Sequence, residues 1–424
     1  MQINRPTSEF LLFFAGIFLL FCPVAMQAQQ KIQGKIIDLE TREPIPFANI
    51  VFDLENKRGT TADLSGNFYI ETREPVSSLK ISHISYETRS YSLGKNTENL
   101  IITLKPKSAE LEQVFIIAEK NPAEKIIKKV IEKRDRNNPE KVSSFTFRSY
   151  NKINFDFLPH PPKDSSKVDS NYLRLTNMSK TMGLMLMESV TERKFIYPNH
   201  DEETVIGTKV SGLKNPTFAS LATNIQPFSF YQDILTVLDR NFVNPISNGS
   251  LSKYDYKLRD TIFQDADTVY LIEFQPKKGR IFDAMKGMLY VNTHFYAIQN
   301  VIAEPYEAGF MSMKIEQKYM CIDRQQWFPE QLNFEISAEK YPSKDIGMKV
   351  QGQSFIKEIN LNPAITKKDF SMANVVMAKD AGKKDSSFWL TERIDTLSFR
   401  EINTYHVLDS MGEKYKFDQI MKLT

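Results

Sequence analysis

The sequence is poor in the residues that build metal sites and disulfide frameworks. Its 424 residues include two cysteines and five histidines, too few for a disulfide-rich scaffold or a structural zinc site. Removal of the N-terminal segment would leave only Cys321, so we expect no internal disulfide and a buried, unreactive thiol. Charge of one sign is not in excess either, because 55 Lys and Arg against 52 Asp and Glu leave a net charge of +3. This balance argues against nucleic acid as a partner, since such proteins carry a basic surface.

Motifs for catalysis are also absent from the sequence. It has no G-x-S-x-G elbow, no phosphate-binding glycine loop and no H-E-x-x-H segment, so we expect no catalytic, cofactor-binding or metal-binding residues. The one dense set of ligand-type side chains is His200-Asp201-Glu202-Glu203. Adjacent residues on a regular element point to different sides, and we interpret this segment as an exposed acidic turn. A hydrolase with an unmarked carboxylate pair stays the least favoured alternative.

One long apolar run is present, at residues 10–22. It follows Arg5 and precedes Pro23 and Ala28, the pattern of a secretory signal that is cleaved after a small residue. A membrane-spanning helix needs roughly 20 apolar residues, so this run favours a signal over a retained anchor. A lipoprotein is disfavoured because Phe21 occupies the position before Cys22, where lipidation requires a small residue. We expect residues 1–28 to be a signal peptide and the mature protein to be exported, in the periplasm or associated with the outer membrane.

Aromatic residues are plentiful, with 30 Phe and 17 Tyr against 16 Gly, which favours strands over helices. Residues 29–118 alternate apolar and polar side chains in short runs separated by turns, such as the Asp63-Leu64-Ser65-Gly66 turn. About seven strands in this length predict a small antiparallel β-sandwich. The same turn places Asp63, Ser65 and Asn67 at EF-hand spacing, but Phe68 stands where that loop needs Gly, so we interpret it as a structural hairpin.

Several segments of this region resemble a known module. They are Gln33-Gly34-Lys35-Ile36-Ile37-Asp38, Pro44-Ile45-Pro46-Phe47-Ala48-Asn49-Ile50, Gly59-Thr60-Thr61-Ala62-Asp63, Gly66-Asn67-Phe68, Ser85-Tyr86-Glu87 and Leu111-Glu112-Gln113-Val114. Together they are similar to the carboxypeptidase-regulatory-like module of exported Bacteroidota proteins. The resemblance implies a prealbumin-like or immunoglobulin-like sandwich that has no peptidase activity of its own.

Residues 119–140 predict a helical linker. Asn121 and Pro122 form a cap and first-turn pair, and an apolar stripe of i, i+3, i+4, i+7 spacing follows: Ala123, Ile126, Ile127, Val130 and Ile131. The remaining surface is rich in Lys and Arg. We interpret it as the solvated face of a packed helix, with contact to anionic lipid as the alternative.

Residues 141–390 predict a larger curved antiparallel sheet with a few helices, so the whole chain belongs to the mainly β class with some α. Alternation is clear at residues 145–150, 268–274 and 289–302, whereas 218–240 has a helical or mixed pattern. An aromatic sugar or lipid platform at residues 290–296 and 327–329 is the alternative to core packing, which we favour.

This second region also resembles a known family. The segments are Met187-Glu188-Ser189-Val190-Thr191-Glu192-Arg193, Val210-Ser211-Gly212-Leu213-Lys214, Gln226-Pro227-Phe228-Ser229-Phe230-Tyr231, Asn244-Pro245-Ile246-Ser247, Phe274-Gln275-Pro276-Lys277-Lys278-Gly279, Ala297-Ile298-Gln299-Asn300 and Trp327-Phe328-Pro329. They are similar to the Bacteroidota domain-of-unknown-function family that follows the regulatory-like module and often precedes an outer-membrane β-barrel. Nothing after residue 390 has the strands of such a barrel, so we expect the barrel to be absent here.

Residues 391–424 predict a helical tail. Ser398 and Glu401 form a capping box, and Ile402, Tyr405 and Leu408 share one face of the helix that follows. We expect this face to pack on its own domain, with a docking helix as the alternative.

These observations predict a non-enzymatic exported cell-envelope protein, a binding or assembly module at the periplasmic side of the outer membrane. Its partners would be outer-membrane β-barrel or other envelope proteins, its ligand a lipid or a glycan, and no cofactor is expected. The first alternative is a periplasmic lipid or lipoprotein carrier with an apolar cavity.

Overall fold

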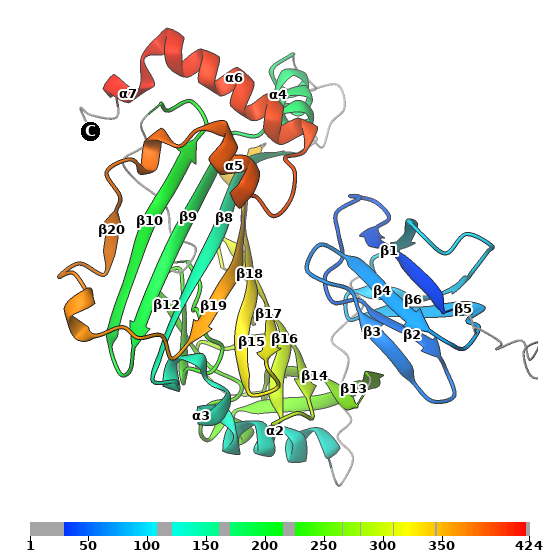
Figure 1. Ribbon diagram of the computed structural model, residues 1–424. Helices are drawn as coiled ribbons and strands as arrows, with labels where there is room; N and C mark the ends of the chain where they lie inside the picture. Colours follow the sequence, from blue (N-terminus) through cyan, green and yellow to red (C-terminus); the bar gives the residue numbers. More distant parts are fainter. Residues whose placement is uncertain are drawn as a thin grey trace, which may run out of the picture.

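The computed structural model describes residues 29–107, 121–160, 170–214, 225–264, 266–279, 281–307, 309–343 and 346–420. The expected signal peptide, residues 1–28, lies outside these ranges. The described chain is mainly β and consists of a small N-terminal sandwich beside a large curved sheet, with helices at both ends of that sheet (Figure 1). The expected fold class is confirmed.

The described part of the sandwich has seven strands in two sheets: β1 (Gln30–Asp38), β2 (Asn49–Asp53), β3 (Arg58–Thr61), β4 (Asn67–Thr72), β5 (Ser78–His83), β6 (Tyr86–Ser92) and β7 (Leu100–Leu104). The orders are β4-β1-β7 and β3-β2-β5-β6. Alternating residues such as Ile32, Phe68, Leu79 and Ile102 fill the space between the two sheets. We expected only antiparallel pairs, but β1 and β7 run parallel. The last residues proposed for this domain, Val114 to Ile117, lie outside the described residues.

The large sheet runs in the order β20-β10-β9-β8-β19-β18-β17-β16-β15-β14-β13. Its neighbours are antiparallel except β10 and β20. The bounds are β8 (Ser144–Pro159), β9 (Met185–Ile196), β10 (His200–Val210), β13 (Tyr254–Gln264), β14 (Asp267–Pro276), β15 (Met285–Asn292), β16 (Ala297–Pro305), β17 (Ser312–Ile322), β18 (Gln326–Ser343), β19 (Ile346–Leu361) and β20 (Val375–Met377). The pairing of Arg58 with Phe263 joins β3 of the sandwich to β13.

Helix α2 (Pro122–Glu132) covers one end of the sheet, next to the short helices α3 (Arg134–Asn137) and η1 (Pro139–Lys141). Asn121 caps it and Pro122 opens it, as the sequence predicts. Ala123, Ile127 and Val130 are buried in the main core, so the packed-helix interpretation is confirmed. One residue of the basic face contacts an aromatic ring: the Lys129 ammonium lies 4.4 Å from the centre of the Tyr296 ring.

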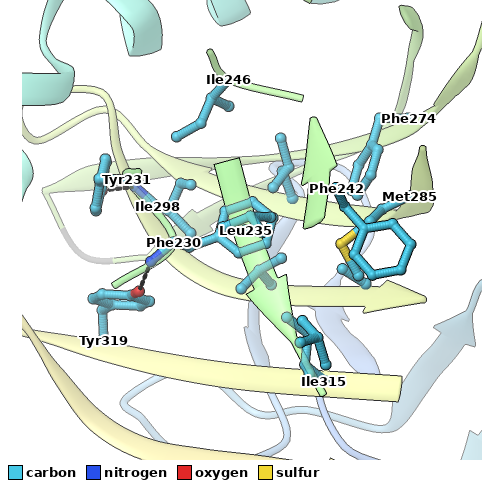
Figure 2. Close-up of a cluster of buried hydrophobic side chains, with 14 of the residues drawn as sticks. Phe230, Tyr231, Leu235, Phe242, Ile246, Phe274, Met285, Ile298, Ile315 and Tyr319 are labelled. Carbon is cyan, nitrogen blue, oxygen red and sulfur yellow. Dashed lines mark hydrogen bonds between the residues drawn. The ribbon is translucent and has the colours of Figure 1, made fainter. Parts of the chain in front are cut away.

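The face of the sheet that carries α2, called the inner face here, is filled by the segment from Ile225 to Ile246. The prediction of a helical or mixed pattern was wrong for its described part, because strands β11 (Ile234–Val237) and β12 (Arg240–Val243) form a hairpin. Figure 2 shows Phe230, Leu235 and Phe242 of this segment packed against residues of the large sheet. The Tyr231 hydroxyl accepts a hydrogen bond from the Ile298 amide at 2.7 Å, which fixes the segment on β16.

The opposite, outer face carries the sandwich and the C-terminal helices α5 (Ser386–Glu392) and α6 (Phe399–Tyr415), which is followed by α7 (Phe417–Ile420). The helix α4 (Ser170–Thr181) lies beside α6. The other 3₁₀ turns of the described residues are η4 (Ser250–Ser252), η5 (Lys367–Asp369) and η6 (Ala381–Lys383). The capping box of Ser398 and Glu401 is confirmed. Tyr405 is buried against the sheet, whereas Ile402, expected on the same face, is exposed. No helix among the described residues is long and apolar enough to span a membrane.

Candidate functional site

The sandwich docks on the outer face of the large sheet through an apolar contact. Phe47 and Leu64 of the sandwich form one buried cluster with side chains of the large sheet: Ile262, Val269, Leu271, Met288, Tyr290 and Ile302. Because these side chains are almost entirely removed from water, their burial favours the docked arrangement. The contact fixes how the two domains face each other and therefore the shape of the space between them.

Polar groups secure the same contact. The Tyr290 hydroxyl donates to the Phe47 carbonyl at 2.8 Å, and the Asn49 amide donates to Asp260 at 2.8 Å. Further along the sheet the Lys349 ammonium lies 2.8 Å from Glu43 of the sandwich and 3.2 Å from Glu335 of its own sheet. A partly buried cation with two carboxylates restricts the register of one domain on the other.

His83 at the end of β5 has a charged neighbour from the large sheet, Lys314 of β17. Burial, and then the nearby ammonium groups of Lys314 and Lys107, lower the pKa of His83 to about 3. Its Nδ1 accepts from the Ser85 amide at 3.2 Å, and its Nε2 is buried without a partner among the described residues. The ring is therefore neutral at physiological pH, and protonation would place a charge beside two cations.

A cleft of about 760 Å³ lies between the sandwich and the large sheet. This volume is within the range of roughly 300–1,000 Å³ of small-ligand sites. The sandwich side is formed by residues of β1, β3, β4 and β7 and their ends: Gln33, Gly34, Lys35, Thr60, Thr61, Ala62, Asp63, Asn67, Phe68, Tyr69, Asn99, Leu100 and Ile101. The sheet side is formed by Gln299, Asn300 and Lys318. Because both domains contribute, the cleft exists only in the docked arrangement.

Asn300 is a lining residue of the cleft with an unsatisfied polar atom. It is 1% exposed, and its side-chain oxygen Oδ1 is buried without a hydrogen-bond partner among the described residues. A buried polar atom without a partner costs about 1–3 kcal/mol. A ligand hydroxyl or amide in the cleft would supply the missing donor.

A β-bulge explains why two successive residues of β16 line the same cleft. Tyr290 pairs with Asn300 and Val291 pairs with Ile298, which leaves Gln299 as the additional residue. A bulge of this kind changes the direction of nearby side chains, which otherwise alternate between the two faces of a strand. The Gln299 amide is held by Asn292, whose Nδ2 donates to Oε1 at 2.9 Å, so the bulge has a fixed geometry.

Two of the three charged residues of the cleft, Asp63 and Lys318, are bound by the protein itself. Asp63 accepts from the amides of Ser65 and Asn67 at 2.9 and 2.8 Å, as expected for a structural hairpin turn. Gly66 completes this turn with φ of +76°, a conformation that disfavours other residues. Lys318 is paired with Glu330 at 3.0 Å. Of the charged residues lining the cleft, Lys35 and Asp63 have no ion-pair partner among the described residues, and only Asp63 is held by hydrogen bonds of its own turn.

The other candidates from the sequence lie elsewhere. The His200–Glu203 segment opens β10 instead of forming an exposed turn, which corrects our interpretation: Asp201 binds Arg193 and Glu202 binds Lys194. The described residues contain no group of His, Cys, Asp and Glu arranged to hold a metal. Cys321 is only partly buried, which also differs from the expectation, and burial raises the pKa of its thiol.

The aromatic segments considered as a binding platform belong to the core instead. Trp327, Phe328 and Tyr290 are at most 5% exposed, which confirms core packing. Sequence reasoning did not identify the cleft. Its residues come from short segments that carry the two family resemblances, such as Gly66-Asn67-Phe68 and Ala297-Ile298-Gln299-Asn300, but nothing in the sequence relates segments more than 200 positions apart.

Comparison with known proteins identifies both regions. The family of unknown function DUF5686 matches residues 126–355, and the CarboxypepD_reg-like domain matches residues 32–116. Neither description names an enzymatic activity. The TonB-dependent receptor P3 of Formosa agariphila is 28% identical over 102 residues, which are 24% of this chain and 10% of the receptor. The chain therefore spans about a tenth of the length of this curated relative.

Two solved structures are similar over most of their own length. A DUF1329 family protein from Desulfovibrio piger is 11% identical, with 60% of this chain and 98% of that chain covered and a TM-score of 0.25. A LolA superfamily protein from Nitrosomonas europaea is 12% identical, with 59% and 97% covered and a TM-score of 0.24.

Proposed function

This chain belongs to the family of unknown function DUF5686, and from the geometry of its cleft we propose that it is a non-enzymatic binding protein of the cell envelope. The ligand lies between the sandwich and the large sheet. The observation that carries the proposal is the buried, unpartnered Oδ1 of Asn300 in a cleft with walls from two domains. Such a site is suited to hold a ligand and, through it, to hold two domains in one arrangement.

The envelope setting is supported by the N-terminal sequence and by one relative. Residues 1–28 have the pattern of an export signal, and the similar segment of the Formosa agariphila protein belongs to a receptor. We therefore place the ligand and any protein partner at the periplasmic side of the outer membrane. Outer-membrane and other envelope proteins are the partner class of this proposal.

The lipid-carrier alternative gains no support from the inner face. Phe230, Leu235 and Phe242 occupy the apolar space that an acyl chain would need there, and all three are at most 1% exposed. A carrier would have to remove this segment from the core to load lipid. Native mass spectrometry of gently purified protein tests the carrier function: retained lipid mass, together with no shift of the cleft residue Ile101 by lipid, would favour the carrier.

The proposal is tested by finding where on the protein a ligand binds. Methyl resonances of isoleucine are followed while the full chain is titrated with four fractions of envelope extract: neutral polysaccharide, anionic polysaccharide, lipid and peptide. Ile101 lines the cleft and is 61% exposed, whereas Ile394 is 48% exposed on the C-terminal segment. We expect one fraction to shift Ile101 and leave Ile394 unchanged. If no fraction shifts Ile101, the cleft is not a binding site and the proposal fails.

A second experiment tests export. The protein is expressed with its own N-terminus in a Bacteroidota host, and the mass of the mature chain is measured in the cytoplasmic and envelope fractions. We expect a chain that begins at Gln29, in the envelope fraction. A full-length chain in the cytoplasm would contradict the envelope setting.

A further inference from the structure

We infer that the cleft ligand is a neutral, polyhydroxylated chain, a glycan, an assignment that rests on the proposed function. The lining of the cleft is rich in side-chain amides: Gln33, Asn67, Asn99, Gln299 and Asn300. An amide carries a donor and an acceptor on one planar group. It therefore matches the adjacent hydroxyls of a sugar ring, each of which donates and accepts.

Some side-chain amides of the cleft have hydrogen-bonding groups without a partner. The side chains of Gln33 and Asn99 make no hydrogen bond to any described residue, and the Oδ1 of Asn300 has no donor. These groups come from β1, from the loop residue before β7 and from β16. Because they lie on two domains, a ligand that bonds to all three bridges the cleft.

The charges of the cleft argue against a strongly ionic ligand. The carboxylate of Asp63 is bound by its own turn, and the ammonium of Lys318 is paired with Glu330 at 3.0 Å. An anionic ligand would meet Lys35 but also Asp63 within the same lining. A neutral ligand is not repelled by the Asp63 carboxylate, since a hydroxyl needs only a hydrogen-bond partner.

Two side chains of the sandwich offer the apolar contact that a sugar ring requires. Tyr69 and Ile101 are 49% and 61% exposed and line the cleft. The Tyr69 hydroxyl donates to Glu71 at 3.2 Å, which restrains the aromatic ring. A sugar ring has a polar rim and an apolar C–H face, and an aromatic side chain can pack against that face.

The experiment uses the full chain and a panel of defined oligosaccharides: neutral β- and α-linked glucans, xylan and mannan, with polygalacturonate as the anionic member. Binding is measured by calorimetry. We expect at least one neutral oligosaccharide to bind, with the Tyr69→Ala and Gln33→Ala variants each weakening it by about tenfold, the loss of one good contact. Tyr341→Ala is the matched control, because Tyr341 is 54% exposed at the end of β18.

The Asn300→Leu variant tests whether Asn300 binds the ligand or only supports the fold. Replacing an unpartnered buried amide with an apolar side chain of similar size does not destabilise the free protein. We therefore expect unchanged or higher thermal stability together with about tenfold weaker oligosaccharide binding. If Asn300→Leu lowers stability and binding in parallel, its role is structural and the assignment of Asn300 fails.

The outcomes distinguish this inference from the proposed function. Binding of the anionic member or of a peptide in a Tyr69-dependent manner would overturn the glycan assignment and leave the proposed binding site standing. Ile101 shifts with the peptide or lipid fraction, together with no binding of any oligosaccharide, would have the same meaning. Absence of both kinds of signal would overturn both proposals.

Discussion

Glu188 of β9 has a carboxylate with no exposed surface and hydrogen bonds on both oxygens. Arg393 binds it with two contacts of 2.7 Å, and the hydroxyls of Tyr150 and Tyr405 donate to it at 2.7 Å each. Burial raises the pKa of Glu188, but these four hydrogen bonds and the guanidinium outweigh burial, so the pKa lies below its usual value. The group remains ionised and attaches the C-terminal segment to the sheet.

Replacement of Glu188 by Gln is expected to destabilise the protein by about 3–5 kcal/mol, because it leaves the Arg393 charge partly buried without its partner. Tyr405→Phe removes one of the four hydrogen bonds and should cost only about 1–2 kcal/mol. Both are measured by urea unfolding. Glu87→Gln is the matched control, since Glu87 pairs with Lys105 on the surface and its loss is expected to change stability by less than about 1 kcal/mol. Equal effects of the two glutamate substitutions would contradict the role of Glu188.

At the scale of the element, the hairpin β11–β12 is held by its tertiary environment. Its burial alternates along β11, where Leu235 and Val237 are buried and Ile234 and Thr236 are exposed. The isolated hairpin is too short to be stable in water. It folds because its apolar side chains complete the core of the inner face.

Leu235→Ala is expected to lower the free energy of unfolding by about 2–5 kcal/mol, as for buried leucines in general. Ile234→Ala lies next to it on the same strand and should change stability by less than about 1 kcal/mol, because Ile234 is 45% exposed. Denaturant unfolding of the two variants measures the difference. Similar losses for both would mean that the hairpin does not present the described face to the core.

The same hairpin shows where sequence reasoning succeeds and where it fails. Strand alternation and end signals predicted the sandwich, the Asn121 cap and the Ser398 capping box, because these depend on neighbours within a few residues. Residues 218–240 gave a helical or mixed pattern because their apolar spacing fits several structures, and only the packing of residues 234–243 on the sheet selects a hairpin there. The fold class could thus be predicted, whereas this segment could not.

The candidate site was beyond sequence reasoning for a related reason. No motif in the sequence around Asn300 identifies it as a site residue. Gln33 and Asn99 are likewise ordinary strand and loop residues. The cleft results from docking of one domain on the other through Phe47, Leu64 and the large sheet. Pairings across the fold, such as Glu188 with Arg393, are equally invisible before the strands are ordered.

At the scale of the whole molecule, His83 makes the stability of the folded protein sensitive to acid. The pKa of His83 is about 3 in the folded protein, whereas a histidine in an unfolded chain has a pKa near 6.5. Between these values the unfolded chain binds a proton that the folded protein does not. The contribution of His83 to stability is therefore complete above about pH 6.5 and is lost as the pH falls toward 3.

Thermal or urea unfolding between pH 7 and pH 4 measures this effect. We expect stability to fall by up to about 1.4 kcal/mol per pH unit for this one group. The His83→Asn variant should show a shallower decrease over the same range, and His406→Asn, which changes an exposed residue of α6, should retain the slope of the unaltered protein. Identical slopes for the His83 variant and the unaltered protein would contradict the assignment.

The outer face of the large sheet bears both the sandwich and the C-terminal helices, and this has a mechanical consequence. Lys349 of β19 holds the sandwich through Glu43, and β19 pairs along its length with β8, which pairs with β9 and hence with Glu188 and Arg393. The two attachments are therefore connected by three neighbouring strands, so a load on the C-terminal helices would be carried toward the sandwich by the backbone hydrogen bonds of these antiparallel ladders.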